Sequence, residues 1–140
     1  KKDIVALSRR LGLKNATFLD SVPKERVPAL LSLADAVLVP LIKAETFKTV
    51  LPSKIFEAAA MGKPILLGVE GLARETIESY GAGVCFEPGN EADFLAKLRL
   101  LSADAALRRR LQEGCVRLAA AHDRRLLAAE MYRLLVALKK

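Results

Sequence analysis

One histidine, two cysteines and no tryptophan occur among the 140 residues of this chain, and these scarcities exclude several kinds of chemistry. With His122 alone, a histidine-rich metal centre cannot form and a catalytic triad has a single candidate base. We expect this residue to occupy a solvent-exposed helix end. Cys85 and Cys115 show no metal-ligand spacing. We therefore expect reduced, buried thiols and, by default, a cytoplasmic location.

Long apolar runs and glycine-rich motifs are also missing. No run approaches the roughly 18 residues that span a bilayer, and no signal peptide opens the sequence. G-x-G-x-x-G, Walker A and G-x-S-x-G motifs are all absent, so the common phosphate-binding loops cannot be assigned. A nucleotide-binding α/β half usually opens with a strand and such a loop, whereas this sequence opens inside a helical pattern. We expect the domain to be truncated at its front.

Positive charge is concentrated at one end of the chain. Residues 1–96 carry 12 basic and 12 acidic side chains, so the net charge of +7 belongs to residues 97–140. A basic flank of this kind suits solvent, an anionic membrane face or nucleic acid. Aromatic residues make up only 5% and do not alternate with basic ones, which argues against nucleic acid. A solvated face is the simplest interpretation, with the membrane face as its main alternative.

A hydrophobic content of 52% suits one folded domain over residues 1–140. Short apolar runs at 16–19, 36–39, 65–67 and 84–86 predict four strands, and a helical pattern fills each gap. This alternation predicts an α/β fold with a Rossmann-like, doubly wound parallel sheet followed by C-terminal helices. Helices are expected at 3–13, 27–34, 52–61, 72–79, 91–101, 104–121 (or from Ser102) and 123–138.

The stretch 49–68 organises the chain, because it predicts a loop, a helix, a sharp stop and a buried strand. Pro52 suits the first turn of a helix, and Ser53 can offer its oxygen to the free N–H groups there. Gly62 predicts a left-handed end, and Pro64 prevents continuation. The apolar run that follows is typical of a central parallel strand covered on both faces.

Two polar residues, Lys54 and Glu57, interrupt this otherwise apolar helix. The first turn of a helix presents unpaired N–H groups and partial positive charge, which together favour an anion. Lys54 would add positive charge where the helix dipole disfavours it unless an anion is bound. The alternative, that both side chains only face water, is equally compatible with the residue types.

Five segments, at 17–23, 34–40, 52–65, 81–84 and 87–90, occur in register and resemble the C-terminal domain of group 1 (family-4-like) glycosyltransferases. The branch that adds amino-sugars in bacterial surface polysaccharide synthesis is the most similar. The resemblance implies the GT-B arrangement of two facing Rossmann-like domains, of which the C-terminal one holds a UDP- or GDP-type sugar donor. It further implies transfer to a hydroxyl with retention, no cofactor, no metal, and no catalytic residue on this domain.

The resemblance also implies which residues meet the donor. Glu57 would be the second Glu of the E-x7-E motif and bind the ribose hydroxyls, since a carboxylate accepts from two O–H groups at once. The first Glu of that motif falls on Thr49, which is carried over only as a position near the donor.

The remaining positions concern the diphosphate and the base. The start of the helix, at Leu51, Ser53 and Lys54, would meet the diphosphate, with the last two as the stronger candidates because Pro52 has no N–H to donate. Val22 would line the base pocket.

The implied partners are the nucleotide sugar and the chain's own N-terminal acceptor domain, without which we expect this fragment to be inactive. The basic C-terminal helices could hold the full enzyme at the inner face of an anionic membrane, through the arginines at positions 108, 109, 110, 117, 124 and 125. No nucleic-acid partner is expected. Two alternatives remain: a nucleotide-sugar epimerase, which the single histidine disfavours, and an α/β interaction module without a ligand.

Overall fold

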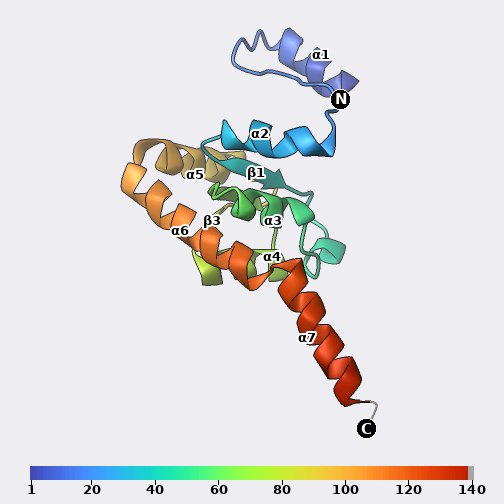
Figure 1. Cartoon of the computed structure of the whole chain (residues 1–140). Helices are drawn as coiled ribbons and strands as arrows, with labels where there is room; N and C mark the ends of the chain where they lie inside the picture. The colour runs from blue at the N-terminus through green and yellow to red at the C-terminus, as the bar shows by residue number, and fades with distance from the viewer. Residues whose placement is uncertain (139–140) are drawn as a thin grey trace.

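A computed structural model describes residues 1–138 (Figure 1). Two short 3₁₀ turns, η1 (Lys24–Arg26) and η2 (Glu45–Phe47), precede α2 and α3. The regular elements are α1 (Lys2–Arg10), α2 (Val27–Ser32), β1 (Val37–Pro40), α3 (Ser53–Ala60), β2 (Ile65–Gly68), α4 (Leu72–Tyr80), β3 (Gly83–Cys85), α5 (Glu91–Ala103), α6 (Ala105–Ala121) and α7 (Arg124–Ala137). This alternation followed by helices confirms the predicted α/β class.

The strands form one parallel sheet in the order β1-β2-β3. At its centre, Leu66 is aligned with Leu38 on one side and with Val84 on the other. All four residues of β2 are buried, which is why this strand has no polar residue: a central parallel strand is covered on both faces.

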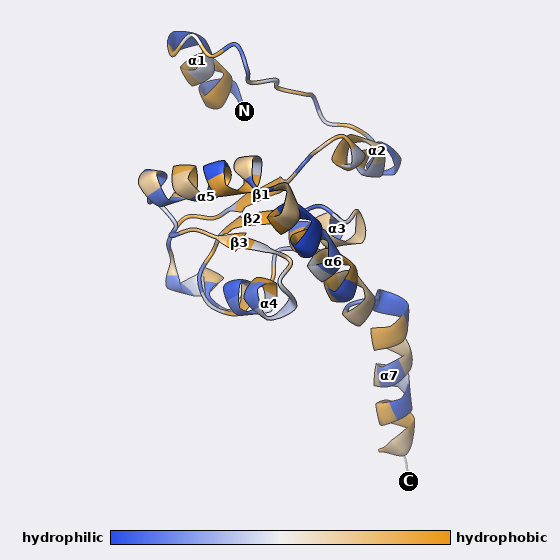
Figure 2. Cartoon of the chain, turned by 90° about the vertical axis from the view of Figure 1, so that its left-hand side faces the viewer, coloured by the Kyte–Doolittle hydropathy of each residue, from blue (hydrophilic) through white to orange (hydrophobic). Residues whose placement is uncertain are grey.

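Helices cover both faces of the sheet, so it is doubly wound (Figure 2). Ile65 and Leu67 point to one face, where they pack with α3, α4 and the second half of α6. Leu66 points to the opposite face and packs against α5 and the first turns of α6. Because alternate residues of a strand face opposite sides, each helical layer receives its own hydrophobic core.

The helix α3 begins and ends close to where the sequence predicts. Pro52 lies one residue before it, with φ −62° and ψ 130°, and Gly62 ends it with φ 61°. The Lys63 N–H donates to the Ala58 carbonyl at 2.9 Å, which satisfies one of the last free carbonyls. The expected Ser53 cap is wrong, because Pro52 occupies the capping position and no side chain caps this helix within residues 1–138.

The strand expected at 16–19 is also wrong. Residues 14–23 are non-helical, exposed for the most part, and join no ladder in the part of the chain that the structure describes. A strand exists only where a neighbour accepts and donates its backbone hydrogen bonds, and an apolar run by itself carries no information about that neighbour. Three strands, not four, therefore make the sheet.

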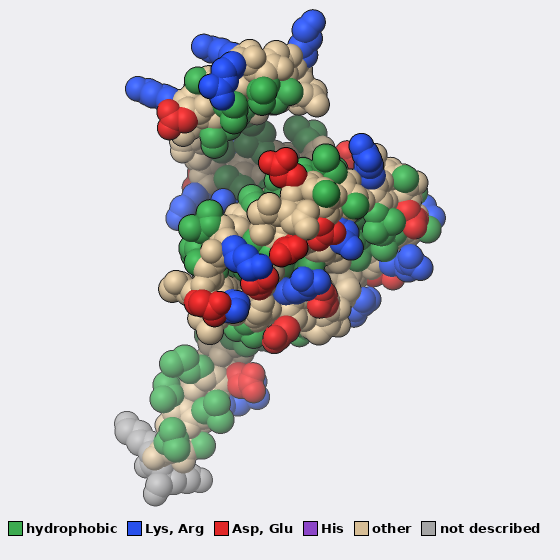
Figure 3. All heavy atoms as spheres, turned by 180° about the vertical axis from the view of Figure 1, so that it is seen from behind, with side chains coloured by type: hydrophobic (Ala, Val, Ile, Leu, Met, Phe, Trp, Pro, Cys, Tyr) green, Lys and Arg blue, Asp and Glu red, His purple; other side chains and the backbone are tan. Residues whose placement is uncertain are grey.

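The helix α7 leaves the rest of the chain and projects away from it (Figures 1 and 2). All of its residues are exposed, and its large apolar side chains cover much of its surface (Figure 3). These are Leu126, Leu127, Met131, Tyr132, Leu134, Leu135 and Val136. Among residues 1–138, no helix combines the length and apolar composition that crossing a bilayer requires.

His122 lies at the junction of α6 and α7 and is half-buried, so the expected solvent-exposed position is wrong. Its ring centroid is 4.9 Å from that of Phe56 on α3 and 5.7 Å from that of Tyr80 on α4. Its Nδ1 lies 3.0 Å from the Leu118 carbonyl oxygen. The histidine therefore packs against α3 and α4 at the point where α7 begins.

Both cysteines are free and buried, as the sequence predicts. Burial raises the pKa of the Cys85 thiol to about 12 and that of the Cys115 thiol to about 11. The Cys115 thiol also donates to the Ala82 carbonyl at 3.1 Å. Since only the thiolate is an effective nucleophile or metal ligand, both residues serve the core.

Candidate functional site

The three parallel strands end at Pro40, Gly68 and Cys85, on one edge of the sheet. Three loops, at 41–52, 69–71 and 86–90, therefore meet at this edge. The loop 41–52 leads directly into the amino end of α3. In open α/β sheets ligands bind beside the carboxyl ends of the strands, so this edge is the candidate site.

The loop 41–52 is fastened to the sheet through its backbone. The Leu41 N–H donates to the Gly68 carbonyl at 3.0 Å, and the Leu72 N–H donates to the Lys48 carbonyl at 2.8 Å. Gly71, with φ 71° and ψ −140°, allows the second contact. A Cβ atom there would lie only 2.3 Å from the Lys48 oxygen.

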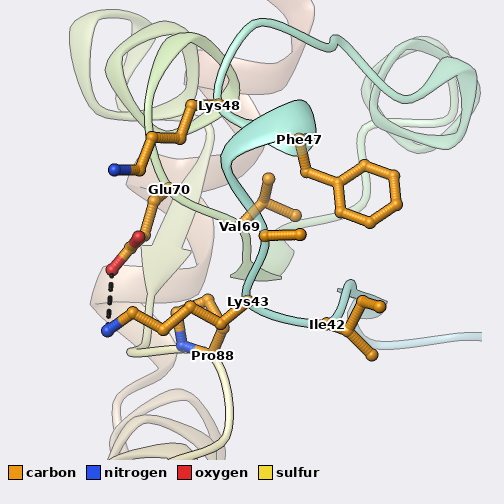
Figure 4. Close-up of a pocket in the computed structure, with 8 residues that line it drawn as sticks. Ile42, Lys43, Phe47, Lys48, Val69, Glu70 and Pro88 are labelled. Atoms are coloured by element: carbon orange, nitrogen blue, oxygen red, sulfur yellow. Dashed lines mark ion pairs between the residues drawn. The ribbon is translucent and has the colours of Figure 1, made fainter.

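An ion cluster joins all three loops. The Lys43 Nζ lies 3.4 Å from Glu70 Oε1 and 3.3 Å from Glu87 Oε1, and Figure 4 shows the first of these pairs. The bond to Glu87 and the charge of Glu70 raise the pKa of Lys43. The Asn90 amide, 3.1 Å from Glu87 Oε2, and Lys43 lower the pKa of Glu87.

A small pocket lies beside the ion cluster (Figure 4). Its lining comes from the loop 41–52, from Val69 and Glu70, and from Pro88. It has room for no more than about one water molecule. The pocket is therefore part of the packing that shapes the loop, and it is too small to hold a nucleotide.

The amino end of α3 is open to solvent. Within residues 1–138 the backbone N–H groups of Ser53 and Lys54 donate to no acceptor, whereas the Ile55 N–H donates to the Pro52 carbonyl at 3.0 Å. Two donors and the positive end of the helix dipole therefore face water, an arrangement that favours an anion.

Ser53, Lys54 and Glu57 are exposed, while the neighbouring Ile55 and Ala58 are buried. Residues three and four positions apart share one face of a helix, so Glu57 lies one turn beyond the free N–H groups. In the described part of the chain, neither the Lys54 nor the Glu57 side chain forms an ion pair or hydrogen bond. The structure thus brings three of the expected site residues together on one free surface.

The other three expected residues lie elsewhere. Thr49 is exposed on the loop before α3, and Leu51 is half-buried against the core beneath that helix. Val22 lies before α2, and no hydrogen bond or ion pair of the described residues connects its backbone or side chain to α3. Its place in a base pocket stays a prediction.

Sequence reasoning missed Lys43, Glu70 and Glu87. Lys43 and Glu70 lie in none of the five segments that carry the resemblance, and Glu87 opens the last of these segments without a role assigned to it. One signal could have found them: each lies within a few residues of the end of a parallel strand, and such ends share one edge of the sheet.

Solved structures of glycosyltransferases share this fold. WaaG, a glycosyltransferase involved in lipopolysaccharide biosynthesis, superposes with a TM-score of 0.71 at 20% identity, covering 87% of this chain and 32% of that one. Sucrose-phosphate synthase from Thermosynechococcus elongatus gives 0.79 at 23% identity, covering 97% and 34%. The C-terminal domain of a group 1 family glycosyl transferase from Francisella tularensis gives 0.65 at 20% identity, covering 86% and 60%. No curated protein matched the sequence.

The fold defines the class: an α/β domain of the kind found in GT-B glycosyltransferases. The family model described as glycosyl transferases group 1 matches residues 1–115, and the chain belongs to that family. It spans about a third of the length of WaaG and of the sucrose-phosphate synthase.

Proposed function

We propose that this chain is the donor-binding domain of a retaining GT-B glycosyltransferase. The full-length enzyme would move a sugar from a UDP- or GDP-type donor to a hydroxyl acceptor, in the synthesis of bacterial surface polysaccharides or other glycans. Membership of the group 1 family supports glycosyl transfer. The involvement of WaaG in lipopolysaccharide biosynthesis supports the setting, and the likeness to a C-terminal domain supports the place of this chain in the enzyme.

The observation that carries the proposal is the free surface at the start of α3. A nucleoside diphosphate is the leaving group of the reaction, and catalysis requires stabilisation of its developing charge. The N–H groups of Ser53 and Lys54 would receive the phosphate oxygens, with the helix dipole and the Lys54 ammonium adding positive potential.

Glu57 would bind the sugar of the nucleotide. Its carboxylate is exposed one helical turn from the proposed diphosphate position and has no protein partner within residues 1–138. A carboxylate can accept from both vicinal hydroxyls of a ribose. Thr49 and Leu51 would border the donor from the loop 41–52.

The acceptor side would come from an N-terminal domain of the full-length enzyme, and we expect this fragment alone to be inactive.

Membrane contact is a separate proposal with less support. Of the six arginines in question, Arg108 and Arg117 donate to backbone carbonyls and Arg125 pairs with Asp123. Binding to vesicles that does not change with anionic lipid content or with salt would rule this contact out.

Calorimetry with UDP and with GDP tests the donor site. Wild type should bind at least one of them, and Glu57→Gln should weaken that binding about tenfold, because hydrogen bonds to a charged group are worth about 1.5–3 kcal/mol. Glu130→Gln is the matched control, since Glu130 is an exposed glutamate on α7, the helix that projects away from the rest of the chain. Absence of binding to any nucleotide would contradict the proposal and favour a ligand-free interaction module.

A further inference from the structure

We propose that Lys43 is a positioning residue for the donor site: by bridging Glu70 and Glu87, it ties the three loops of the carboxyl edge into one unit. The link between Lys43 and donor binding rests on the proposed function. The bridge itself is an observed contact of three side chains. We call these three residues the Lys43 bridge.

Geometry supports this assignment. Lys43 lies three residues after the end of β1, Glu70 follows β2, and Glu87 follows β3. The two contacts, 3.4 and 3.3 Å, therefore span every loop at this edge. The other ion pair on the same loop, between Lys48 and Glu45, spans only three residues and stays within η2 and its end.

The bridge complements the backbone fastening at Lys48. The bond from the Leu72 N–H holds the middle of the loop 41–52 against α4, and the Lys43 bridge holds its beginning. Only four residues, 49–52, separate Lys48 from the start of α3. Any displacement of the loop therefore changes where the exposed Thr49 and the first turn of α3 lie.

Charge gives a second reason for a cation at this position. Glu70 and Glu87 place two carboxylates on the edge where the diphosphate would bind. Without Lys43, their negative charges would repel one another and the ligand. With Lys43 between them, the cluster has one net negative charge instead of two. The two carboxylates then hold the loop 41–52 through their ion pairs with Lys43.

Amide hydrogen exchange tests the bridge, and calorimetry with UDP or GDP tests its role. Lys43→Met should speed exchange of the Leu72 amide, which reports the contact with Lys48, and should weaken nucleotide binding, each by about threefold to tenfold. Raising the salt concentration should speed the same exchange in wild type but not in Lys43→Met, since salt screens exposed charges.

Three comparisons separate positioning from general stability. Lys43→Arg should restore both the slow exchange and the affinity, because it keeps the cation. Arg74→Met removes an exposed ion pair within α4, that with Glu78 at 2.8 Å, and should change neither. Glu87→Gln keeps a polar side chain and removes one charge. The Leu72 amide in this variant should exchange at a rate between those of wild type and Lys43→Met.

The bridge, its positioning role and the donor site can each fail separately. Unchanged Leu72 exchange in Lys43→Met would overturn the bridge. Faster exchange with unchanged nucleotide affinity would overturn the positioning role. If wild type binds no nucleotide, the donor-site proposal fails, whereas the exchange measurements still decide whether Lys43 holds the loops together.

Discussion

Replacing Gly71 by alanine tests how tightly the loop 41–52 is held against α4. The backbone at Gly71, with φ 71° and ψ −140°, lies in a region that residues with a side chain rarely adopt. An added Cβ would lie 2.3 Å from the Lys48 oxygen and 2.8 Å from the Lys48 carbonyl carbon. Ordinary contact begins near 3.5 Å, so the Lys48 backbone must retreat by about 1 Å.

The expected loss of stability has two parts. Backbone strain costs about 1–3 kcal/mol, and overpacking against a backbone group costs about as much again. We expect a fall of roughly 3 kcal/mol or more in the free energy of unfolding, measured by urea denaturation, and of about 10 °C in Tm. The Leu72 amide should also exchange faster, because its bond to the Lys48 carbonyl is strained.

Gly89→Ala is the control for this experiment. Gly89 also has a positive φ, 81°, but a Cβ there would meet nothing within 4 Å. Its replacement should therefore cost only the backbone strain, about 1–2 kcal/mol. Equal losses in the two variants, with unchanged exchange at Leu72, would refute the close contact between Gly71 and the loop.

Two further predictions concern the junction of α6 with α7 and the acid stability of the carboxyl edge. His122→Ala should lower the free energy of unfolding by about 1 kcal/mol through loss of two ring contacts, whereas His122→Phe should keep most of it; equal urea midpoints for both variants would contradict the stacking role. The pKa of Glu87 lies below its ordinary value of 4.5 because of the Asn90 amide and Lys43, so its contribution is present above pH 4.5 and disappears as the pH falls through the lowered pKa. Urea titrations between pH 6 and pH 3 should show a smaller loss of stability in Glu87→Gln than in wild type, and parallel curves would count against the ion cluster.

Local physical chemistry explains why much of the fold is predictable from the sequence. Pro52, Gly62 and Pro64 act on their own backbone, and they place α3 within a residue or two of its observed limits. The side chains of Asn90 and Asp104 accept from N–H groups three residues later, at 3.0 and 2.8 Å. Interactions of this range are visible in a single sequence.

Features that depend on distant partners could not be predicted in the same way. The apolar run at 16–19 has the composition of a strand and no pairing partner among residues 1–138. His122 is half-buried because aromatic rings from α3 and α4 meet it. The same distinction applies to the site. The free face of α3 follows from the local sequence, whereas the Lys43 bridge forms only once the strands have assembled.

Pro40 ends β1 with a residue that has no N–H to offer to a further strand. The N–H groups of Val37 and Leu41 donate inward, to the Pro64 and Gly68 carbonyls at 2.9 and 3.0 Å. The outward backbone groups of this strand therefore belong to Leu38 and Pro40. A proline has no N–H to donate. A strand added along the outer rim could therefore receive a hydrogen bond from the Leu38 N–H but none from Pro40, so its pairing would weaken beside the loops.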